Sequence, residues 1–268
     1  MVSFRIITDS TADFPPEWDI PFVPVHVYAG IVDMKDKVDF TVDTLLDITR
    51  KGIRARTAAP SVKEWMRAFE SLGNDLPILA ITISSKLSGT FKSAEIAAKM
   101  LAKKGFEVHV LDSLTGSIGA GILVARAKEM AEKGVPIGDA LQKLRALVNR
   151  VRIYLVVADM EAAARSGRLP NVVGKIGKFL RLNPIFVVKD GVFHLWKTVR
   201  GQERVVQEFA DLIRGKKEVW AGVLGRNEYA DRMASEIREN CERVVVCSVD
   251  PAIGARLGYG SFGVAFLE

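Results

Sequence analysis

Four short segments rich in hydroxyl side chains have the composition of an anion-binding site: residues 8–11, 57–61, 84–90 and 112–117. Three of them follow apolar runs typical of parallel strands, which predicts that they meet at the carboxyl edge of one sheet, where α/β proteins bind ligands. Helix N-termini at such an edge present free N–H groups and a positive dipole end. Added Ser and Thr hydroxyls would bind a carboxylate or phosphate there, although any one of these turns is also typical of a simple N-cap.

Motifs of common catalytic sites are missing from the sequence, which has no GxxxxGK[ST], HExxH or GxSxG. His26, His109 and His194 fall in separate predicted strands, as expected for histidines of a sheet. Residues 258–263 match GxGxxG, but only five residues follow, too few for the helix that a dinucleotide site requires. The two cysteines lack CxxC spacing and are expected to be thiols. We therefore expect no metal and no cofactor.

Composition places the chain among globular proteins. Its net charge is +6 and its pI is about 9.3, but basic and acidic residues alternate along the predicted helices, so no nucleic-acid partner is expected. An acidic ligand fits this balance. No apolar run is long enough for an integral membrane segment, and the first residues lack the apolar core of a signal peptide, so a cytoplasmic location is expected.

The predicted elements alternate between strand and helix in the first half, which indicates a mostly parallel, Rossmann-like sheet. Strands are expected at residues 4–8, 22–28 (an edge strand), 77–83 and 107–111. Helices are expected at residues 42–51, 62–72, 89–103, 117–133 and 138–149.

The second half is predicted to be a mixed sheet. A strand at residues 153–157 and a hairpin at 185–196 around Asp190-Gly191 precede strands at 219–224, 244–249 and 262–267, with helices at 203–213 and 229–239. The fold class is therefore α/β with two α/β domains, residues 1–150 and residues 151–268.

The same turns resemble motifs of the DegV family, in order and over nearly the whole chain. The most specific match is residues 84–91, SSKLSGTF, which is similar to the family's SSxLSGTY. Residues 9–13 (DSTAD) and 57–61 (TAAPS, for TSxPS) also match. Further matches are Asp112-Ser113 with residues 119–121, residues 165–169 (RSGRL, for GGRI) and residues 197–200.

This resemblance implies a protein that binds one long-chain fatty acid as a ligand between its two α/β domains and is not itself an enzyme. The acyl chain would lie in an apolar tunnel, and the carboxylate would be presented to a fatty-acid kinase that forms an acyl phosphate. The residues expected to bind the carboxylate are Thr57, Ser61, Ser88, Gly89, Thr90 and Arg256. Arg168 and Arg200 are candidates for handling the head group or docking the kinase, and Asp9, Ser10, Asp112 and Ser113 are expected to support the turns.

Two departures from the family pattern affect this site. Ala58 stands where the family usually has Ser, and Arg256 stands where it has His, with Tyr259 in place of the Pro of a GPG. Since Arg can pair bidentately with a carboxylate or a phosphate, anion binding is still expected.

Two other functions remain open at this point. An enzyme, such as a phosphotransferase acting on a small anionic substrate, could use the hydroxyl turns with Arg168, Arg200 and Arg256 as an oxyanion clamp. No histidine lies near those turns in the sequence, so Asp9 or Asp112 would need a raised pKa to act as the general base. A regulatory module whose lipid is a signal has the same sequence features as a carrier.

Overall fold

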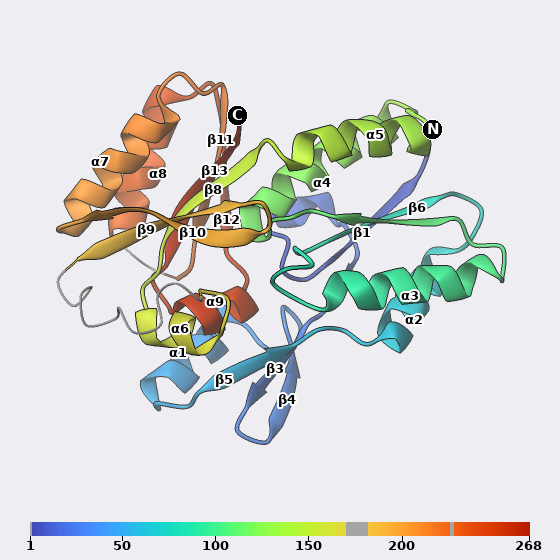
Figure 1. Cartoon of the computed structure of the whole chain (residues 1–268), viewed down its shortest axis with the longest axis horizontal. Helices are drawn as coiled ribbons and strands as arrows, with labels where there is room; N and C mark the ends of the chain where they lie inside the picture. Colours follow the sequence, from blue (N-terminus) through green and yellow to red (C-terminus); the bar gives the residue numbers. More distant parts are fainter. Residues whose placement is uncertain (1, 170–181, 226–227) are drawn as a thin grey trace.

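The structure is a computed structural model and describes residues 2–169, 182–225 and 228–268. Its helices and two large sheets form alternating layers, with a small third sheet at one side (Figure 1). One large sheet comes from the first half of the chain and the other from the second half. The predicted α/β class is confirmed.

The first sheet is parallel throughout, as predicted. Its strands lie in the order β2-β1-β6-β7. Their bounds are β1 Arg5–Asp9, β2 Phe22–Val23, β6 Ile78–Thr82 and β7 Val108–Asp112. Every residue of β6 is buried because helices cover both faces of the sheet. One face carries α2 (Val62–Leu72) and α3 (Thr90–Ala102), and the other carries α4 (Ser117–Glu132) and α5 (Ile137–Val148).

The second sheet is mixed, again as predicted, and has the order β10-β9-β8-β13-β11-β12. Only β11 and β12 pair in parallel; the other neighbours are antiparallel. The bounds are β8 Val151–Val156, β9 Asn183–Lys189, β10 Val192–Val199, β11 Glu218–Val223, β12 Arg243–Ser248 and β13 Phe262–Leu267. Helices α7 (Gln202–Ile213) and α8 (Glu228–Asn240) pack on its outer face.

Helix α4 lies between the two sheets and is buried on nearly all sides along its first half. Its glycines permit this close approach. A Cβ on Gly121 would lie 2.0 Å from the carbonyl oxygen of Asp13, and one on Gly119 would lie 2.7 Å from Cδ1 of Ile153. The N-terminus of α4 therefore reaches the seam between the two halves, where the cavity described below is found.

A three-stranded antiparallel sheet was not predicted, and it has the order β4-β3-β5. Its strands are β3 His26–Ala29, β4 Val32–Lys35 and β5 Ala55–Ala58. The prediction of one strand over residues 22–28 is wrong because β2 and β3 belong to different sheets. Pro24 lies between them and has no N–H to donate to either ladder.

Short helices complete the chain. They are α1 (Val42–Arg50), α6 (Met160–Arg165), α9 (Pro251–Leu257) and the 3-10 turn η1 (Pro16–Trp18). Helices α6 and α9 pack against each other, and α9 also contacts α1 and β5. Among the described residues, no helix is long and apolar enough to cross a membrane. The division into domains at position 150 stays a prediction, since the core around α4 includes side chains from both sides of that position.

Candidate functional site

A cavity of about 190 Å³ lies between the two large sheets and is lined from both halves of the chain. It is bounded by β5, by the loops after β1, β6 and β7, by strands of the second sheet and by α9. Most of its wall is apolar. The apolar side chains are Val25, Ala58, Ala59, Ile83, Leu87, Ile118, Ile153, Leu155, Leu169, Val188, Phe193, Val249, Ala252, Ile253, Leu257 and Phe262.

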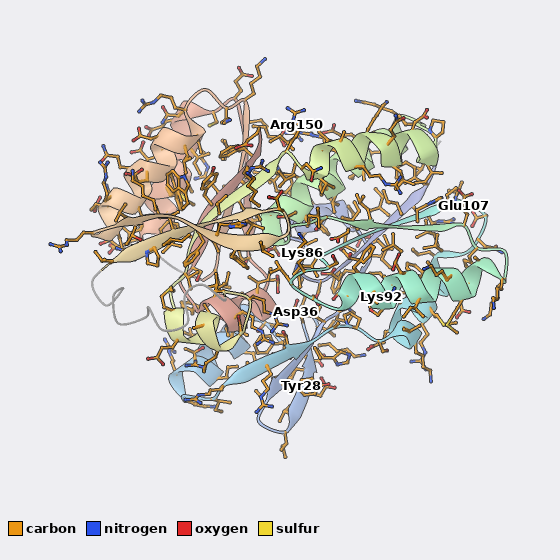
Figure 2. The ribbon with its side chains drawn as sticks, viewed as in Figure 1. Tyr28, Asp36, Lys86, Lys92, Glu107 and Arg150 are labelled. Atoms are coloured by element: carbon orange, nitrogen blue, oxygen red, sulfur yellow. The ribbon has the colours of Figure 1, made fainter. Side chains whose placement is uncertain are left out.

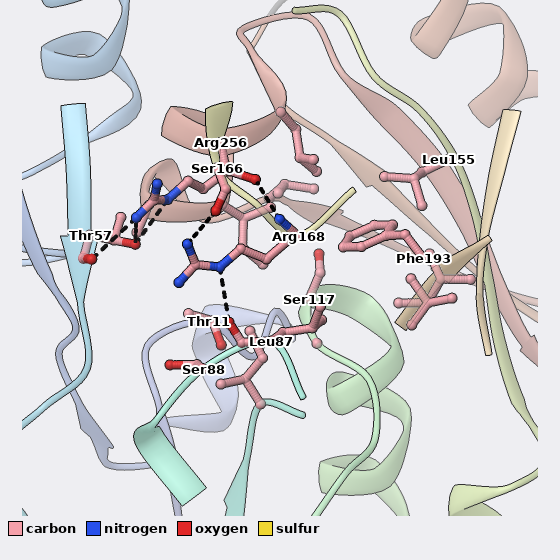
Figure 3. Close-up of a pocket in the computed structure, with 18 of the residues that line it drawn as sticks. Thr11, Thr57, Leu87, Ser88, Ser117, Leu155, Ser166, Arg168, Phe193 and Arg256 are labelled. Carbon is pink, nitrogen blue, oxygen red and sulfur yellow. Dashed lines mark hydrogen bonds between the residues drawn. The ribbon is translucent and has the colours of Figure 1, made fainter. Parts of the chain in front are cut away.

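The polar wall is gathered on one side of the cavity. Figure 3 shows the guanidinium groups of Arg168 and Arg256 with Thr57 and Ser88 on that side, and Leu155 and Phe193 on the other. Ala58 and Gly89, which also line the cavity, are exposed, so the polar end lies near the surface. The cavity therefore has one charged end close to solvent and one apolar end inside the fold.

Arg256 and Thr57 are bound to each other across 199 residues of sequence. Nε and Nη2 of Arg256 donate to Oγ1 of Thr57 over 3.0 and 2.6 Å, and Nη2 also donates to the Thr57 carbonyl. Arg168 is fixed differently, because its Nε donates to the carbonyl of Leu87 over 3.1 Å and its Nη1 to that of Ser166. Both guanidinium groups are thus oriented by backbone or hydroxyl oxygens.

Neither arginine pairs with a carboxylate within the parts of the chain that the structure describes. Burial and, to a smaller extent, the positive charge of Arg168 together lower the pKa of Arg256 to about 10. Two half-buried cations that repel each other are costly unless an anion joins them. The arrangement is therefore suited to binding an anionic group.

Asp9 and Asp112, the two carboxylates expected to support the turns, accept hydrogen bonds from the loops around them. The Asp9 side chain accepts hydrogen bonds from the Ile83 N–H at 2.7 Å and from the N–H and hydroxyl of Thr11. Asp112 accepts from the N–H groups of Ser85 and Leu114, each at 3.1 Å. These two aspartates tie the loops after β1, β6 and β7 to one another.

The hydroxyls of Ser10 and Ser113 form hydrogen bonds with backbone groups of nearby segments. Ser10 Oγ accepts from the Val25 N–H at 3.1 Å, and Ser113 Oγ donates to the Thr115 carbonyl. Burial raises the pKa of Asp9, the direction that a general base at these turns requires. Both of its oxygens are nevertheless occupied by Ile83 and Thr11, which favours a supporting role over proton transfer.

The remaining predicted residues are divided between the cavity and its surroundings. Ser88 and Gly89 line the cavity, whereas the buried Thr90 lies behind them with its Oγ1 2.9 Å from Oγ of Ser88. Ser61 lies outside the lining and caps α2 in a capping box with Glu64. Arg200 is exposed after β10 and is also outside the lining.

Sequence reasoning missed Thr11 and Ser117, whose side chains line the cavity. Each is the last residue of a turn that stood out in the sequence, Thr11 of residues 8–11 and Ser117 of residues 112–117. Ser117 has a φ of 49°, an uncommon value for a residue with a side chain, and its hydroxyl donates to Oδ2 of Asp13 over 2.6 Å. A hydroxyl at the start of a glycine-rich helix was the available signal.

A buried acidic cluster behind α9 was also missed. Asp36 and Asp250 are both buried, and each accepts a hydrogen bond from the N-terminus of α9, Asp36 Oδ1 from the Ala252 N–H and Asp250 Oδ1 from the Ile253 N–H. The Oδ2 atom of each has no hydrogen-bond partner within the described part of the chain. Figure 2 labels Asp36 near the middle of the molecule. Lys37 lies beside them and donates to Asp13 over 3.0 Å.

Burial is the main reason why the pKa values of these two carboxyls are raised. It raises the pKa of Asp36 to about 6, although Ser10, Lys37 and Asp250 oppose the shift. Burial also raises the pKa of Asp250 well above its usual range, with the charges of Asp36 and Asp13 adding to the shift and Lys37 opposing it. The N-terminus of α9 is thus held by a carboxyl pair that can share a proton.

No group of three or more His, Cys, Asp or Glu among the described residues is placed to hold a metal ion. The donors at the polar end are guanidinium and hydroxyl groups, which bind anions. Together with the apolar wall, this set is suited to a molecule with a long apolar part and an anionic head.

Comparison with known proteins agrees with this geometry. A DegV domain-containing protein of Staphylococcus aureus is 28% identical over 276 residues, which is 98% of each chain. A structure described as fatty-acid binding of a DegV family protein from Thermus thermophilus is 26% identical, with a TM-score of 0.89 over 100% of both chains. The fatty acid kinase (Fak) B3 protein of Streptococcus pneumoniae, loaded with linoleic acid, has a TM-score of 0.86 at 20% identity over 99% of both chains, and so shares the fold.

The resemblance noted in the turns is thereby tested on the whole chain. The model of the DegV family matches residues 3–268. The matched region includes both large sheets, the loops that line the cavity, and α9 with Arg256. The chain belongs to the DegV family.

Proposed function

We propose that this protein binds one long-chain fatty acid, with the acyl chain in the apolar part of the cavity and the carboxylate at Arg168 and Arg256. The observation that carries the proposal is an apolar cavity ending at two guanidinium groups that no described carboxylate neutralises. The Thermus thermophilus relative, a fatty-acid-binding protein by its description, supports the same ligand class.

The free energy of binding is expected to come mainly from the acyl chain. Burying a methylene group contributes about 0.8 kcal/mol, so a chain of about fourteen contributes on the order of 11 kcal/mol before the costs of binding. Each hydrogen bond to the charged carboxylate adds about 1.5–3 kcal/mol. The polar end therefore decides which way the ligand lies more than whether it binds.

Titration of delipidated protein with palmitate and with methyl palmitate tests this orientation. Both ligands have the same apolar chain, but the ester carries no charge for the arginines to bind. Palmitate is expected to bind at least about tenfold more tightly at pH 7.5, given the strength of charged hydrogen bonds. Equal affinities would contradict a carboxylate at Arg168 and Arg256.

Presentation of the ligand to a fatty-acid kinase is the second part of the proposal, and it rests on the family resemblance. The exposed Ala58 and Gly89 at the polar end support it, since they leave the head group close to the surface. Arg200, exposed outside the cavity, is proposed to contact the kinase.

Substitution of Arg200 tests this docking role. In an assay of acyl-phosphate formation with a bacterial fatty-acid kinase and ATP, Arg200→Ala is expected to lower the rate while the affinity for palmitate is unchanged. An unchanged rate would remove Arg200 from the docking surface. Loss of palmitate affinity in the same variant would show that Arg200 acts on the ligand instead.

A further inference from the structure

The polar end of the cavity carries more positive charge than a fatty acid can neutralise. Arg168 and Arg256 both line it, each half-buried, and the charge of Arg168 is strong enough to lower the pKa of Arg256. A carboxylate brings one negative charge, so one of the two guanidinium charges would stay uncompensated in a partly dry site. The charge of the site thus matches a head group with two negative charges.

Hydrogen-bond donors for a larger head group are also present. Arg256 uses Nε and Nη2 for Thr57, and Arg168 uses Nε and Nη1 for backbone carbonyls, which leaves Nη1 of Arg256 and Nη2 of Arg168 with no hydrogen-bond partner within the described ranges. Thr57 Oγ1 accepts from Arg256, so its own proton is available. The hydroxyl of Ser88 lies on the same side of the cavity (Figure 3).

We propose that this end of the cavity binds the phosphate of a single-chain lipid phosphomonoester more tightly than it binds a carboxylate. The inference rests on the proposed function, because it assumes that an acyl chain fills the apolar part. A phosphomonoester carries about 1.5–2 negative charges near pH 7 and offers three acceptor oxygens. Guanidinium groups bind such oxygens in forked, charge-assisted pairs, so two arginines and two hydroxyls fit this head group.

Three ligands with the same fourteen-carbon chain can distinguish the effect of head-group charge on affinity from the effect of head-group shape. Myristate is planar with one charge, tetradecyl sulfate is tetrahedral with one charge, and tetradecyl phosphate is tetrahedral with nearly two. Their affinities would be measured below micelle-forming concentrations by displacement of a fluorescent fatty acid from the full chain. At pH 7.5 we expect the phosphate to bind at least about tenfold more tightly than either single-charge ligand, as one further charge-assisted hydrogen bond would give.

The pH dependence provides a second readout. The second pKa of a phosphomonoester is about 6, so at pH 5 the phosphate carries one charge and its advantage over the sulfate is expected to disappear. Arg256→Gln is expected to reduce the advantage at pH 7.5 to less than about threefold, because only one guanidinium remains. Arg214→Gln, at an exposed arginine paired with Asp211 after α7, is the matched control and should keep the advantage.

Several results would overturn the inference. Equal affinities for sulfate and phosphate at pH 7.5 would mean that shape decides and charge does not. Tighter binding of myristate would also contradict it while leaving the fatty-acid function intact, and binding of none of the three would contradict both. If the phosphate is preferred, 1-myristoyl lysophosphatidate then distinguishes a phosphate on the chain itself from one carried across a glycerol.

Discussion

Two pairs of like charges lie at opposite ends of α9, and they differ in how their repulsion is relieved. At its N-terminus, Asp36 and Asp250 are buried close enough for the charge of Asp36 to raise the pKa of Asp250, and Lys37 lies nearby. In its last turn, Arg256 faces Arg168 without a described carboxylate partner. A carboxyl pair can be relieved by one shared proton, but a guanidinium does not lose its proton near neutral pH. The acidic pair is thus complete within the fold, and the basic pair requires an anion from outside.

Removing both arginines should have the largest effect on ligand binding. Arg168→Gln with Arg256→Gln is expected to weaken palmitate binding on the order of a thousandfold, from two lost interactions of about 1.5–3 kcal/mol each. The stability of the ligand-free protein should stay the same or rise, because a repulsive pair is gone. Calorimetric titration and thermal unfolding would measure the two effects. If the ligand-free variant were less stable than the original protein, the two arginines would not form a repulsive pair that requires an anion. Methyl palmitate is the control ligand, and its affinity should not change.

Removing the shared proton should change stability instead of binding. The pKa of Asp36 is raised from 3.8 to about 6, so the folded state binds the Asp36 proton more tightly than the unfolded state does. The resulting contribution to the free energy of unfolding is complete below about pH 4 and is lost as the pH rises to about 6. Asp36→Asn keeps an acceptor for the Ala252 N–H but does not titrate. Urea unfolding from pH 4 to pH 7 should therefore show a decline that is smaller in the variant by on the order of 2 kcal/mol. Parallel pH profiles would contradict the assignment; the exposed Asp47→Asn is the matched control.

A single hydroxyl at the cationic end should have a moderate effect. Ser88→Ala removes one donor for the anion and is expected to weaken palmitate binding by about tenfold, corresponding to about 1.4 kcal/mol. Helix α3 should remain intact, since Gly89 and not Ser88 is at its N-cap position. Fluorescence displacement gives the affinity and circular dichroism the helix content. An unchanged affinity would exclude Ser88 from the head-group site.

Substitution of Ser61 should have the smallest effect on palmitate binding, because Ser61 caps a helix and does not line the cavity. Ser61 caps α2, so Ser61→Ala is expected to lower the free energy of unfolding by about 1 kcal/mol and to leave palmitate affinity unchanged within about twofold. Chemical denaturation and titration of the same preparation would measure both. If Ser61→Ala weakened palmitate binding as much as Ser88→Ala, Ser61 would contact the carboxylate after all.

The fold was largely predictable because many strands and turns of its two large sheets have recognisable local sequence patterns. The apolar run of β6 and the Asp190-Gly191 turn of the β9–β10 hairpin identify their elements without tertiary information. The three-stranded sheet was not predictable in the same way, since β5 has only four residues and pairs with β3 about thirty residues earlier. Helix α9 has seven residues and begins at a proline, too short for a periodic signal.

The site was predictable in its residue types but not in its pairings. The hydroxyl turns after β1, β6 and β7 indicated an anion site from the sequence alone. The bond between Thr57 and Arg256 depends on how two distant segments pack, as does the approach of Arg168 to Arg256. Asp36 gave no signal, because a single aspartate in a loop does not reveal that it will be buried beside Asp250.

Mass spectrometry of the freshly purified protein tests the central claim most directly. A fatty acid bound between the sheets would add its mass to the native protein and would leave on denaturation, which also identifies the chain length. We predict such an adduct, or its appearance on addition of palmitate to delipidated protein. A native mass equal to that of the chain alone, with no shift on adding palmitate or oleate, would contradict fatty-acid binding and would favour an enzyme acting on a small anionic substrate.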